Sequence, residues 1–293
     1  YRAFGLWVEQ LVAESTGKLG TGVVPVLEDG GLPVTAYGED RALVIMRDDT
    51  DTGEAEYARV AREAGVPVID LIPPERAAIG AEFVRWTHAV ALLGFLLGVN
   101  PFDEPDVAHA KAATTGVLSG DVAVPPATTD AEGIWLTPAG ALAGDEVPAD
   151  VTAALSALLD TLHERSYLGI LAYLPELPEL LGPLSESAAK IAQTCRVPVC
   201  VELGPRYLHS TGQLHKGGPE TGSFLLITAR GRSDRPVPGE PFSLAQLFRA
   251  QAEGDLVTLA RRGRPVLRLD LPAEDPASVT RLVAAISRAL SHR

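Results

Sequence analysis

The fold class is decided by the stretch YLGILAYLPELPELLGPLSESAAKIAQTCRVPVCVEL, residues 167–203, in which two apolar runs enclose a helical segment. The runs 167–174 and 197–203 are almost continuously apolar, which is typical of strands buried on both faces of a parallel sheet. Between them, residues 185–195 repeat apolar side chains at three and four positions, the spacing of an amphipathic helix. This order predicts two parallel strands joined by a crossover helix.

The same alternation extends over the rest of the chain. Other apolar runs predict buried strands, and segments with helical spacing separate most of them. The sequence therefore predicts an α/β protein, a three-layer α/β/α sandwich with a mostly parallel sheet. The predicted strands are 21–27, 42–47, 66–72, 167–174, 197–203, 223–229 and 264–271, and the predicted helices include 55–65, 81–98, 185–195, 244–263 and 278–290.

A linker is expected within residues 118–150, which are rich in Pro, Thr, Asp and Gly and keep no sustained period. Both sides repeat helices and strands in a similar order, so two α/β units are predicted, residues 1–130 and residues 131–293. The chain has 293 residues and is 46% apolar, which is enough material for one large or two ordinary domains.

Composition narrows the classes of partner. The net charge of -13 disfavours nonspecific binding to nucleic acid or to an anionic membrane, because both require a basic face. Cys195 and Cys200 are expected to be reduced, buried thiols, which favours a cytoplasmic protein. No signal-peptide pattern opens the sequence, and the apolar stretch 89–99 is too short to span a bilayer. Because a helical pattern is under way within four residues of Tyr1, the chain is expected to begin inside a larger protein.

One carboxylate lies on the apolar side of the first predicted helix. Trp7, Leu11 and Glu14 are spaced by four and three, so Glu14 continues the buried stripe, in the last turn before a C-cap at Gly17. A carboxylate at a helix C-terminus opposes the macrodipole, and partial burial adds to that effect, so both raise its pKa and make it a better proton acceptor. The alternative is that Glu14 turns to solvent or pairs with Lys18.

Three separated motifs resemble phosphoglucose isomerases, and most specifically the form fused behind a transaldolase. The resemblance runs from Phe4 to about Leu271 and implies the SIS sugar-phosphate isomerase fold, in which phosphorylated sugars bind at the carboxyl ends of parallel strands. Transaldolase activity is not expected of this segment, because it needs a Schiff-base lysine on a barrel strand. The motifs are EQLVAESTGKLGTGVVPV at 9–26, LLGVNPFDEPDVAHAK at 96–111 and GPRYLHSTGQLHKGGPETG at 204–222.

The resemblance implies an aldose-ketose isomerase that interconverts glucose 6-phosphate and fructose 6-phosphate without a cofactor or metal. Ring opening and proton transfer between C1 and C2 through a cis-enediol need one base and one group that serves the ring oxygen. By resemblance, Glu14 is the base, His209 opens the ring, and Lys111 binds the anionic substrate and stabilises the enediolate. Without the resemblance, His209 would be a turn or surface residue and Lys111 a solvated helix residue. The further substrate-binding residues expected are Ser15, Thr16, Ser210, Thr211, Gln213 and Lys216, and His215 is expected to face the phosphate or the surface.

Two features depart from the family. In ordinary single-function members the histidine motif follows the glutamate motif closely, whereas here the lysine motif and most of the second unit separate the two. The Ser/Thr-rich phosphate loop and the GGR arginine of the family's upstream domain do not occur in this sequence, although Arg206 and Lys216 could add positive charge. An upstream SIS domain or another chain, which includes a second copy in a homo-oligomer, is therefore the expected partner beside the sugar phosphate. The alternative function is a noncatalytic SIS-like fragment that binds a sugar phosphate or serves assembly.

Overall fold

The computed structural model describes residues 1–28, 31–75, 78–103, 105–144, 148, 150–231, 234–291 and 293, with the backbone alone for 106–110. Its main sheet has the strand order β3-β4-β8-β7-β5-β6. The four strands from β8 to β6 are parallel neighbours, and β4 and β3 extend the sheet in antiparallel pairing. The strands are β3 Thr128–Thr129, β4 Trp135–Ala139, β5 Tyr167–Ala172, β6 Val199–Leu203, β7 Gly222–Ala229 and β8 Val266–Leu271.

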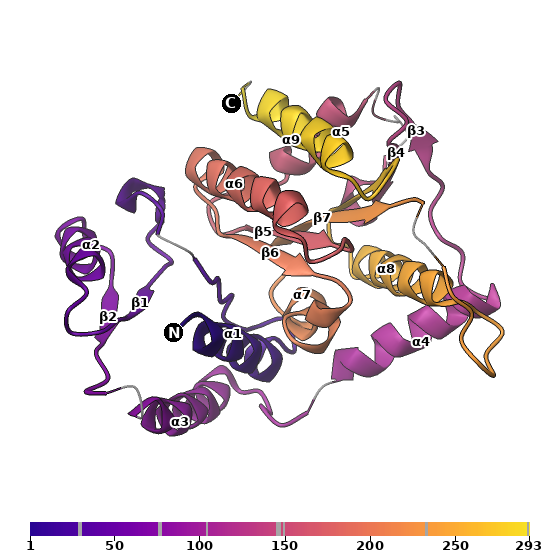
Figure 1. Cartoon of the computed structure of the whole chain (residues 1–293). Coiled ribbons are helices and arrows are strands. Elements are labelled where there is room, and N and C mark those ends of the chain that lie inside the picture. Colours follow the sequence, from indigo (N-terminus) through magenta and orange to yellow (C-terminus); the bar gives the residue numbers. More distant parts are fainter. Residues whose placement is uncertain are drawn as a thin grey trace.

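Helices cover both faces of this sheet (Figure 1). On β5, Leu168 and Ile170 belong to the core beneath α5 (Val151–Asp160), α6 (Pro178–Cys195) and α9 (Pro276–Leu290). Tyr167 and Leu171, which alternate with them, belong to the core beneath α8 (Leu244–Arg261). Every residue of β5 is buried, as expected for a parallel strand between two helix layers. The predicted α/β fold with three layers and a mostly parallel sheet is therefore confirmed.

Local signals fix the helix ends. α8 begins at a capping box, in which the Ser243 hydroxyl accepts from the Gln246 backbone and the Gln246 side chain accepts from the Ser243 backbone. α9 begins with the Asp275 carboxylate accepting from Ser278 N–H and with Pro276 at its first position. These caps define where α8 and α9 begin on opposite faces of the sheet.

The first part of the chain adds α1 (Arg2–Thr16), η1 (Val34–Ala36), β1 (Leu43–Met46), α2 (Thr52–Glu63), β2 (Val68–Leu71) and α3 (Ile79–Leu97). β1 and β2 pair in parallel in a small sheet of their own. Next come α4 (Pro105–Ser119), which packs along α8, and β3, which pairs with β4. Thus α4 and β3 contact elements that follow the boundary predicted near residue 130.

Two sequence predictions differ from the structure. Residues 21–27 form no strand, because their only ladder contact is an isolated bridge from Thr21 to Lys18. Pro25 has no N–H to donate to a ladder, and the segment instead packs Val24 and Val26 against the core beneath α8. Conversely, β4 lies within the predicted linker 118–150, where a short antiparallel strand leaves little periodic signal.

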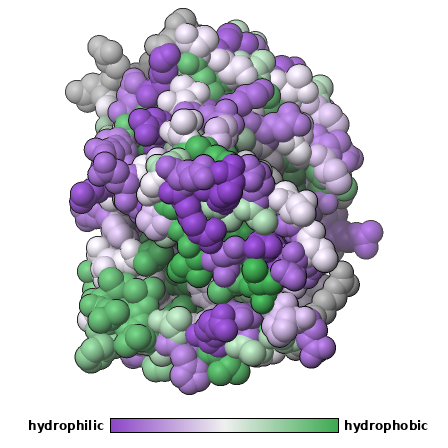
Figure 2. Space-filling model, turned by 90° about the vertical axis from the view of Figure 1, so that its left-hand side faces the viewer, coloured by the Kyte–Doolittle hydropathy of each residue, from purple (hydrophilic) through white to green (hydrophobic). Residues whose placement is uncertain are grey.

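α3 is long and apolar enough to cross a membrane by length and composition, although the stretch 89–99 alone is too short. Only 17% of it is buried in the structure. Exposed apolar side chains of α3 and the loop after it include Leu92, Phe95, Leu96 and Phe102. Figure 2, in which the left-hand side of the Figure 1 view faces the reader, shows apolar surface gathered at one lower corner. The chain has a net charge of -13 and buries two apolar cores around its main sheet, as a soluble protein does. A cytoplasmic location stays a prediction.

Candidate functional site

The end of α1 packs directly on α7 (Gly212–Gly217), so the first and third motifs are in contact. Gln213 donates from Nε2 to the Gly17 carbonyl at 3.0 Å, and Gly20 N–H donates to the Gly217 carbonyl at 2.8 Å. A Cβ on Gly17 would lie 2.4 Å from Leu214 Cα. Gly17 follows the helix as expected for a C-cap, but its φ of -75° shows that close approach to α7, and not a left-handed conformation, requires glycine here.

Lys18 joins the first motif to the second. Its side chain is 3% exposed, and its ammonium ion pairs with Asp103 Oδ1 at 3.0 Å and donates to the carbonyls of Asn100, at 2.7 Å, and Asp103. An ammonium has three protons, and these three acceptors use them all. Lys18 therefore anchors the loop that leads into α4. The alternative in which Lys18 pairs with Glu14 is not what the structure shows, because the Lys18 ammonium has these other partners.

Gln10 connects Glu14 to the histidine motif. Its Nε2 donates to Glu14 Oε2 at 3.2 Å and to the His209 carbonyl at 3.1 Å. Glu14 is half-buried, as its place beside the apolar stripe predicts. Gln10 lies one helical turn before Glu14, and this spacing puts both side chains on one face of α1. The spacing is the sequence signal from which the contact between Gln10 and Glu14 could have been predicted. The structure thus brings Glu14 and the His209 loop together.

His209 ends η4 (Arg206–His209), the short helix that directly follows the carboxyl end of β6. Ligands of parallel α/β sheets bind at this edge. A cleft of about 500 Å³ opens here between α4 and the beginning of α8, named the α4/α8 cleft below. Both Lys111 and His209 line it, with their side chains exposed, whereas Glu14 is not among its lining residues. The lining consists of Lys111, Thr114, Thr115, Leu118, Ser119, Leu208, His209, Pro241, Phe242, Leu247 and Gln251.

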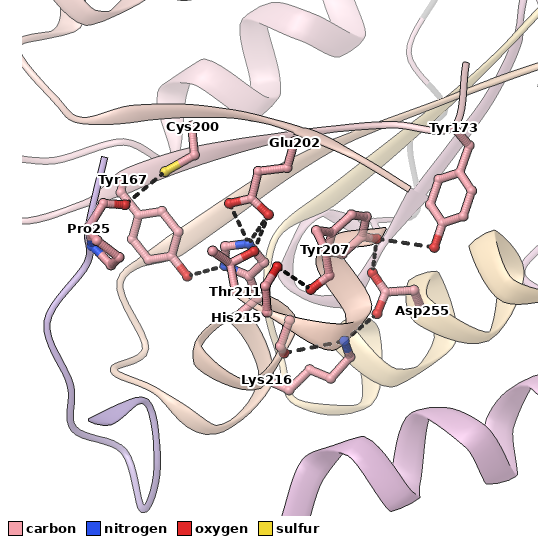
Figure 3. Close-up of polar contacts among 12 residues, drawn as sticks. Pro25, Tyr167, Tyr173, Cys200, Glu202, Tyr207, Thr211, His215, Lys216 and Asp255 are labelled. Carbon is pink, nitrogen blue, oxygen red and sulfur yellow. Dashed lines mark hydrogen bonds and ion pairs between the residues drawn. The ribbon is translucent and has the colours of Figure 1, made fainter. Parts of the chain in front are cut away.

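A buried polar network lies beneath this loop (Figure 3). His215 is 1% exposed, with Nε2 3.2 Å from both carboxylate oxygens of Glu202 and Nδ1 3.0 Å from the Tyr167 hydroxyl. Thr211 also donates to Glu202. Burial raises the pKa of Tyr167 well above its usual value, so its hydroxyl stays protonated and can donate to His215. The expectation that His215 faces the phosphate or the surface is wrong, because it links β5, β6 and α7 inside the protein.

Lys216 belongs to a second buried network. Its ammonium lies 2.6 Å from Asp255 Oδ1 on α8, and both side chains are 1% exposed. Tyr207 of η4 donates to the same carboxylate and lies 3.4 Å from the Tyr173 hydroxyl. This ion pair fastens α7 and η4 to α8. No local pattern indicated it, because Asp255 lies on a helix far beyond Lys216 in the chain.

Glu9 of α1 adds a titratable group near the same region. Its pKa is raised to about 7, chiefly by burial and then by the nearby Glu202 carboxylate. A hydrogen bond with the Leu27 backbone and the charge of Arg206 lower the pKa in part. Arg206 itself is exposed on η4. Burial and the Glu202 carboxylate therefore keep Glu9 partly protonated near neutral pH.

The substrate-binding residues expected from the sequence occupy different places. Ser15 and Ser210 are half-buried, and Ser210 Oγ donates to the Tyr207 carbonyl at 3.3 Å. The other four, Thr16, Thr211, Gln213 and Lys216, are buried, have partners within the protein and do not line the α4/α8 cleft. Thr16 bonds within the first motif, Gln213 joins the third motif to the first, and Thr211 and Lys216 bond Glu202 and Asp255. Binding of substrate by these residues stays a prediction.

The described residues contain no group of three or more His, Cys, Asp or Glu side chains that could hold a metal ion. Cys200 is buried and Cys195 half-buried, and both thiols are free. Burial raises the pKa of both, most strongly that of Cys200, which disfavours the reactive thiolate.

No family model matches the chain. A hypothetical protein from Thermus thermophilus, known from a crystal structure, matches it with a TM-score of 0.42 and 18% sequence identity. The match covers 85% of this chain and 56% of that protein, so the chain spans just over half the length of this structural neighbour.

Proposed function

We propose that the chain is an aldose-ketose isomerase, or the part of one that carries the catalytic residues, and that it interconverts glucose 6-phosphate and fructose 6-phosphate. The SIS fold belongs to this proposal. The reaction needs no external oxidant or reductant, since the two sugars are isomers and C2 is oxidised as C1 is reduced. Any partner that completes the phosphate site, an upstream SIS domain, another chain or a second copy, is part of the same proposal.

The observation that carries the proposal is the meeting of three motifs far apart in sequence. Lys18 of the first motif binds Asn100 and Asp103 of the second, and Gln213 of the third binds the Gly17 carbonyl of the first. These contacts are made by residues of the motifs themselves. A resemblance that arose by chance would not be expected to gather all three at the carboxyl edge of a parallel sheet.

The roles follow from the chemistry of the side chains. Glu14, half-buried and held by the Gln10 amide, would remove the proton at C2 and return it at C1. His209, at the mouth of the cleft, would move a proton at the ring oxygen. Lys111 would supply positive charge, which stabilises the anionic enediolate more strongly than the neutral sugar chain and therefore lowers the barrier.

A noncatalytic sugar-phosphate-binding or assembly role is the second candidate. This role is favoured because Thr211, Gln213 and Lys216 bind partners inside the protein and so do not face a substrate. Among the described lining of the cleft, the charged or titratable side chains are then those of Lys111 and His209. Such a module would bind sugar phosphate without turning it over.

An isomerisation assay separates the two candidates. Fructose 6-phosphate formed from glucose 6-phosphate is measured for the wild-type chain, Glu14→Gln and the control Glu186→Gln, an exposed glutamate on α6 across the sheet. Isomerase function predicts turnover that Glu14→Gln lowers by at least about a hundredfold, as expected for loss of a general base, and that Glu186→Gln leaves unchanged. Equal turnover by Glu14→Gln and wild type would overturn the role of Glu14. No turnover from a folded chain would reject a self-sufficient isomerase and favour an incomplete part of one or the noncatalytic module.

A further inference from the structure

The α4/α8 cleft is large enough for a small molecule, and its lining surface is mostly apolar. Its volume of about 500 Å³ falls within the range of small-molecule sites. The apolar side chains come from α4, η4, α8 and the residues just before α8, so the apolar surface is not confined to one helix. A ligand with an apolar body would therefore bury much of its surface here. The apolar lining residues are Leu118, Leu208, Pro241, Phe242 and Leu247.

Two hydroxyl groups on the α4 side of the cleft already donate to the protein. Thr115 Oγ1 donates to the Lys111 carbonyl at 3.1 Å, and Ser119 Oγ donates to Asp121 Oδ2 at 2.6 Å. A hydroxyl has one proton, so neither group has a further proton to give to a ligand. An apolar ligand would leave both bonds in place and would not leave either donor unpaired.

Lys111 supplies the positive charge of this lining. Its side chain is exposed, and among the described residues its ammonium forms no ion pair. By contrast, Lys18 and Lys216 each form an ion pair inside the protein. No carboxylate is part of the described lining of the cleft. One ammonium without a counter-ion matches a monoanion such as a carboxylate, whereas a phosphate monoester carries close to two negative charges near neutral pH.

The charge and an apolar side chain follow one another along α4. Lys111 and Leu118 lie seven residues apart, which is about two turns and about 10 Å along the helix. This spacing returns a side chain to nearly the same face, and both residues line the cleft. A molecule with its anionic head at Lys111 would therefore extend its tail toward Leu118, between α4 and α8.

We infer that the α4/α8 cleft binds an unbranched alkyl carboxylate of medium chain length, with the carboxylate at Lys111 and the tail along Leu118 and Leu247. Binding of this ligand does not depend on the proposed function. A second part of the inference does rest on that function: the carboxylate occupies the ammonium that would stabilise the enediolate, so the ligand inhibits the isomerase by competing with the sugar phosphate.

The test is isothermal titration calorimetry of the full chain with butanoate, hexanoate and octanoate, each below the concentration at which it forms micelles. Octan-1-ol is the neutral probe with the same tail as octanoate. The variants are Lys111→Met, which keeps the apolar stem of the side chain, and Leu118→Ala and Leu247→Ala, which shorten the apolar lining. The matched controls are Lys190→Met and Leu177→Ala, at exposed positions on α6 and just before it, across the sheet. Circular dichroism checks that each variant is folded.

Each added methylene is expected to tighten carboxylate binding by up to about fourfold, the effect of burying one such group. Lys111→Met should weaken octanoate binding about tenfold or more and leave octan-1-ol binding unchanged, since the lost interaction is with a charged group. Leu118→Ala and Leu247→Ala should each weaken both ligands about threefold or more, because both ligands have the same tail. The two control variants should change neither affinity.

Two results would overturn the site. The first is octanoate that binds Lys111→Met as tightly as wild type, since the head would then not lie at Lys111. The second is an affinity that depends neither on chain length nor on Leu118→Ala and Leu247→Ala, which would mean nonspecific binding of an amphiphile to the surface.

Failure of this inference is distinguishable from failure of the proposed function. Saturable octanoate binding that depends on Lys111, without isomerisation of glucose 6-phosphate by the folded chain, would uphold the site and count against a self-sufficient isomerase. Isomerisation without octanoate binding would overturn the inference and leave the reaction in place. Isomerisation that saturating octanoate does not inhibit would overturn the competition between the two ligands.

Discussion

The Lys216–Asp255 ion pair gives the sharpest prediction about what holds the histidine loop in place. With Nζ and Oδ1 2.6 Å apart, the charges attract by about 6 kcal/mol at an effective dielectric constant of about 20. Both side chains are 1% exposed, and removing such ions from water costs several kcal/mol each. The net contribution of the intact pair is therefore small, but a lone charge left in its place is costly.

Lys216→Met should lower the free energy of unfolding by about 3–5 kcal/mol, because Asp255 is then buried without its counter-ion. The double variant Lys216→Met/Asp255→Asn removes both charges and keeps an oxygen that accepts from Tyr207. It should regain about 2 kcal/mol or more of that loss. Lys190→Met, an exposed lysine on α6, should change stability by less than about 0.5 kcal/mol.

Urea unfolding followed by circular dichroism measures all four proteins. A Lys216→Met chain destabilised by less than about 1 kcal/mol would refute the reasoning, because breaking a buried pair leaves an uncompensated charge. A double variant no more stable than Lys216→Met would refute it as well, since the cost would then come from lost packing and not from the unpaired charge.

Three other predictions concern α1 and the segment that follows it. Gln10→Leu should lower isomerase turnover roughly tenfold with little loss of stability, since it frees Glu14 from one of its hydrogen bonds; a loss confined to stability in urea unfolding would contradict this. Lys18→Met should lower the free energy of unfolding by about 2–4 kcal/mol, because it strands two carbonyls and Asp103, and an unchanged urea midpoint would count against the anchor. Glu9 has a folded pKa of about 7, above its unfolded value near 4.5, so its stabilising effect is complete at low pH and is lost as pH rises from about 4.5 through 7. Glu9→Gln should therefore gain stability relative to wild type over this window, by at most about 3 kcal/mol at about pH 8, and a difference that does not change with pH would contradict the assignment.

Most of the main sheet could be predicted from sequence because its central strands are buried on both faces. Runs such as 167–172 and 222–229 are apolar along nearly their whole length, and this signal does not depend on which elements cover them. Residues 21–27 carry a similar signal, yet their apolar side chains pack on the core as an extended segment beside β6, where Cys200 Sγ lies 3.9 Å from the Pro25 carbonyl. Burial can thus be inferred from the chain more reliably than hydrogen-bond pairing.

The candidate site was predictable only in part. Glu14 stood out because a carboxylate interrupts an apolar stripe, and the structure places it half-buried beside Gln10. The partners of His215 and Lys216 could not be found in the same way, because Glu202 and Asp255 come from a strand and a helix that only the fold brings near. Both residues lie in a glycine-rich motif that suggests an exposed loop, whereas the motif is packed between α1, α8 and the sheet.

The most direct test of the central claim is to follow the hydrogen at C2 during turnover. Glucose 6-phosphate deuterated at C2 is incubated with the chain in ordinary water, and the fructose 6-phosphate formed is analysed by NMR and mass spectrometry. Transfer through an enediol with Glu14 as the base predicts a slower reaction than with protonated substrate, partial loss of deuterium to water, and neither product nor exchange with Glu14→Gln. Fructose 6-phosphate formed by Glu14→Gln at the wild-type rate, with all deuterium retained, would contradict the assignment of Glu14 as the base.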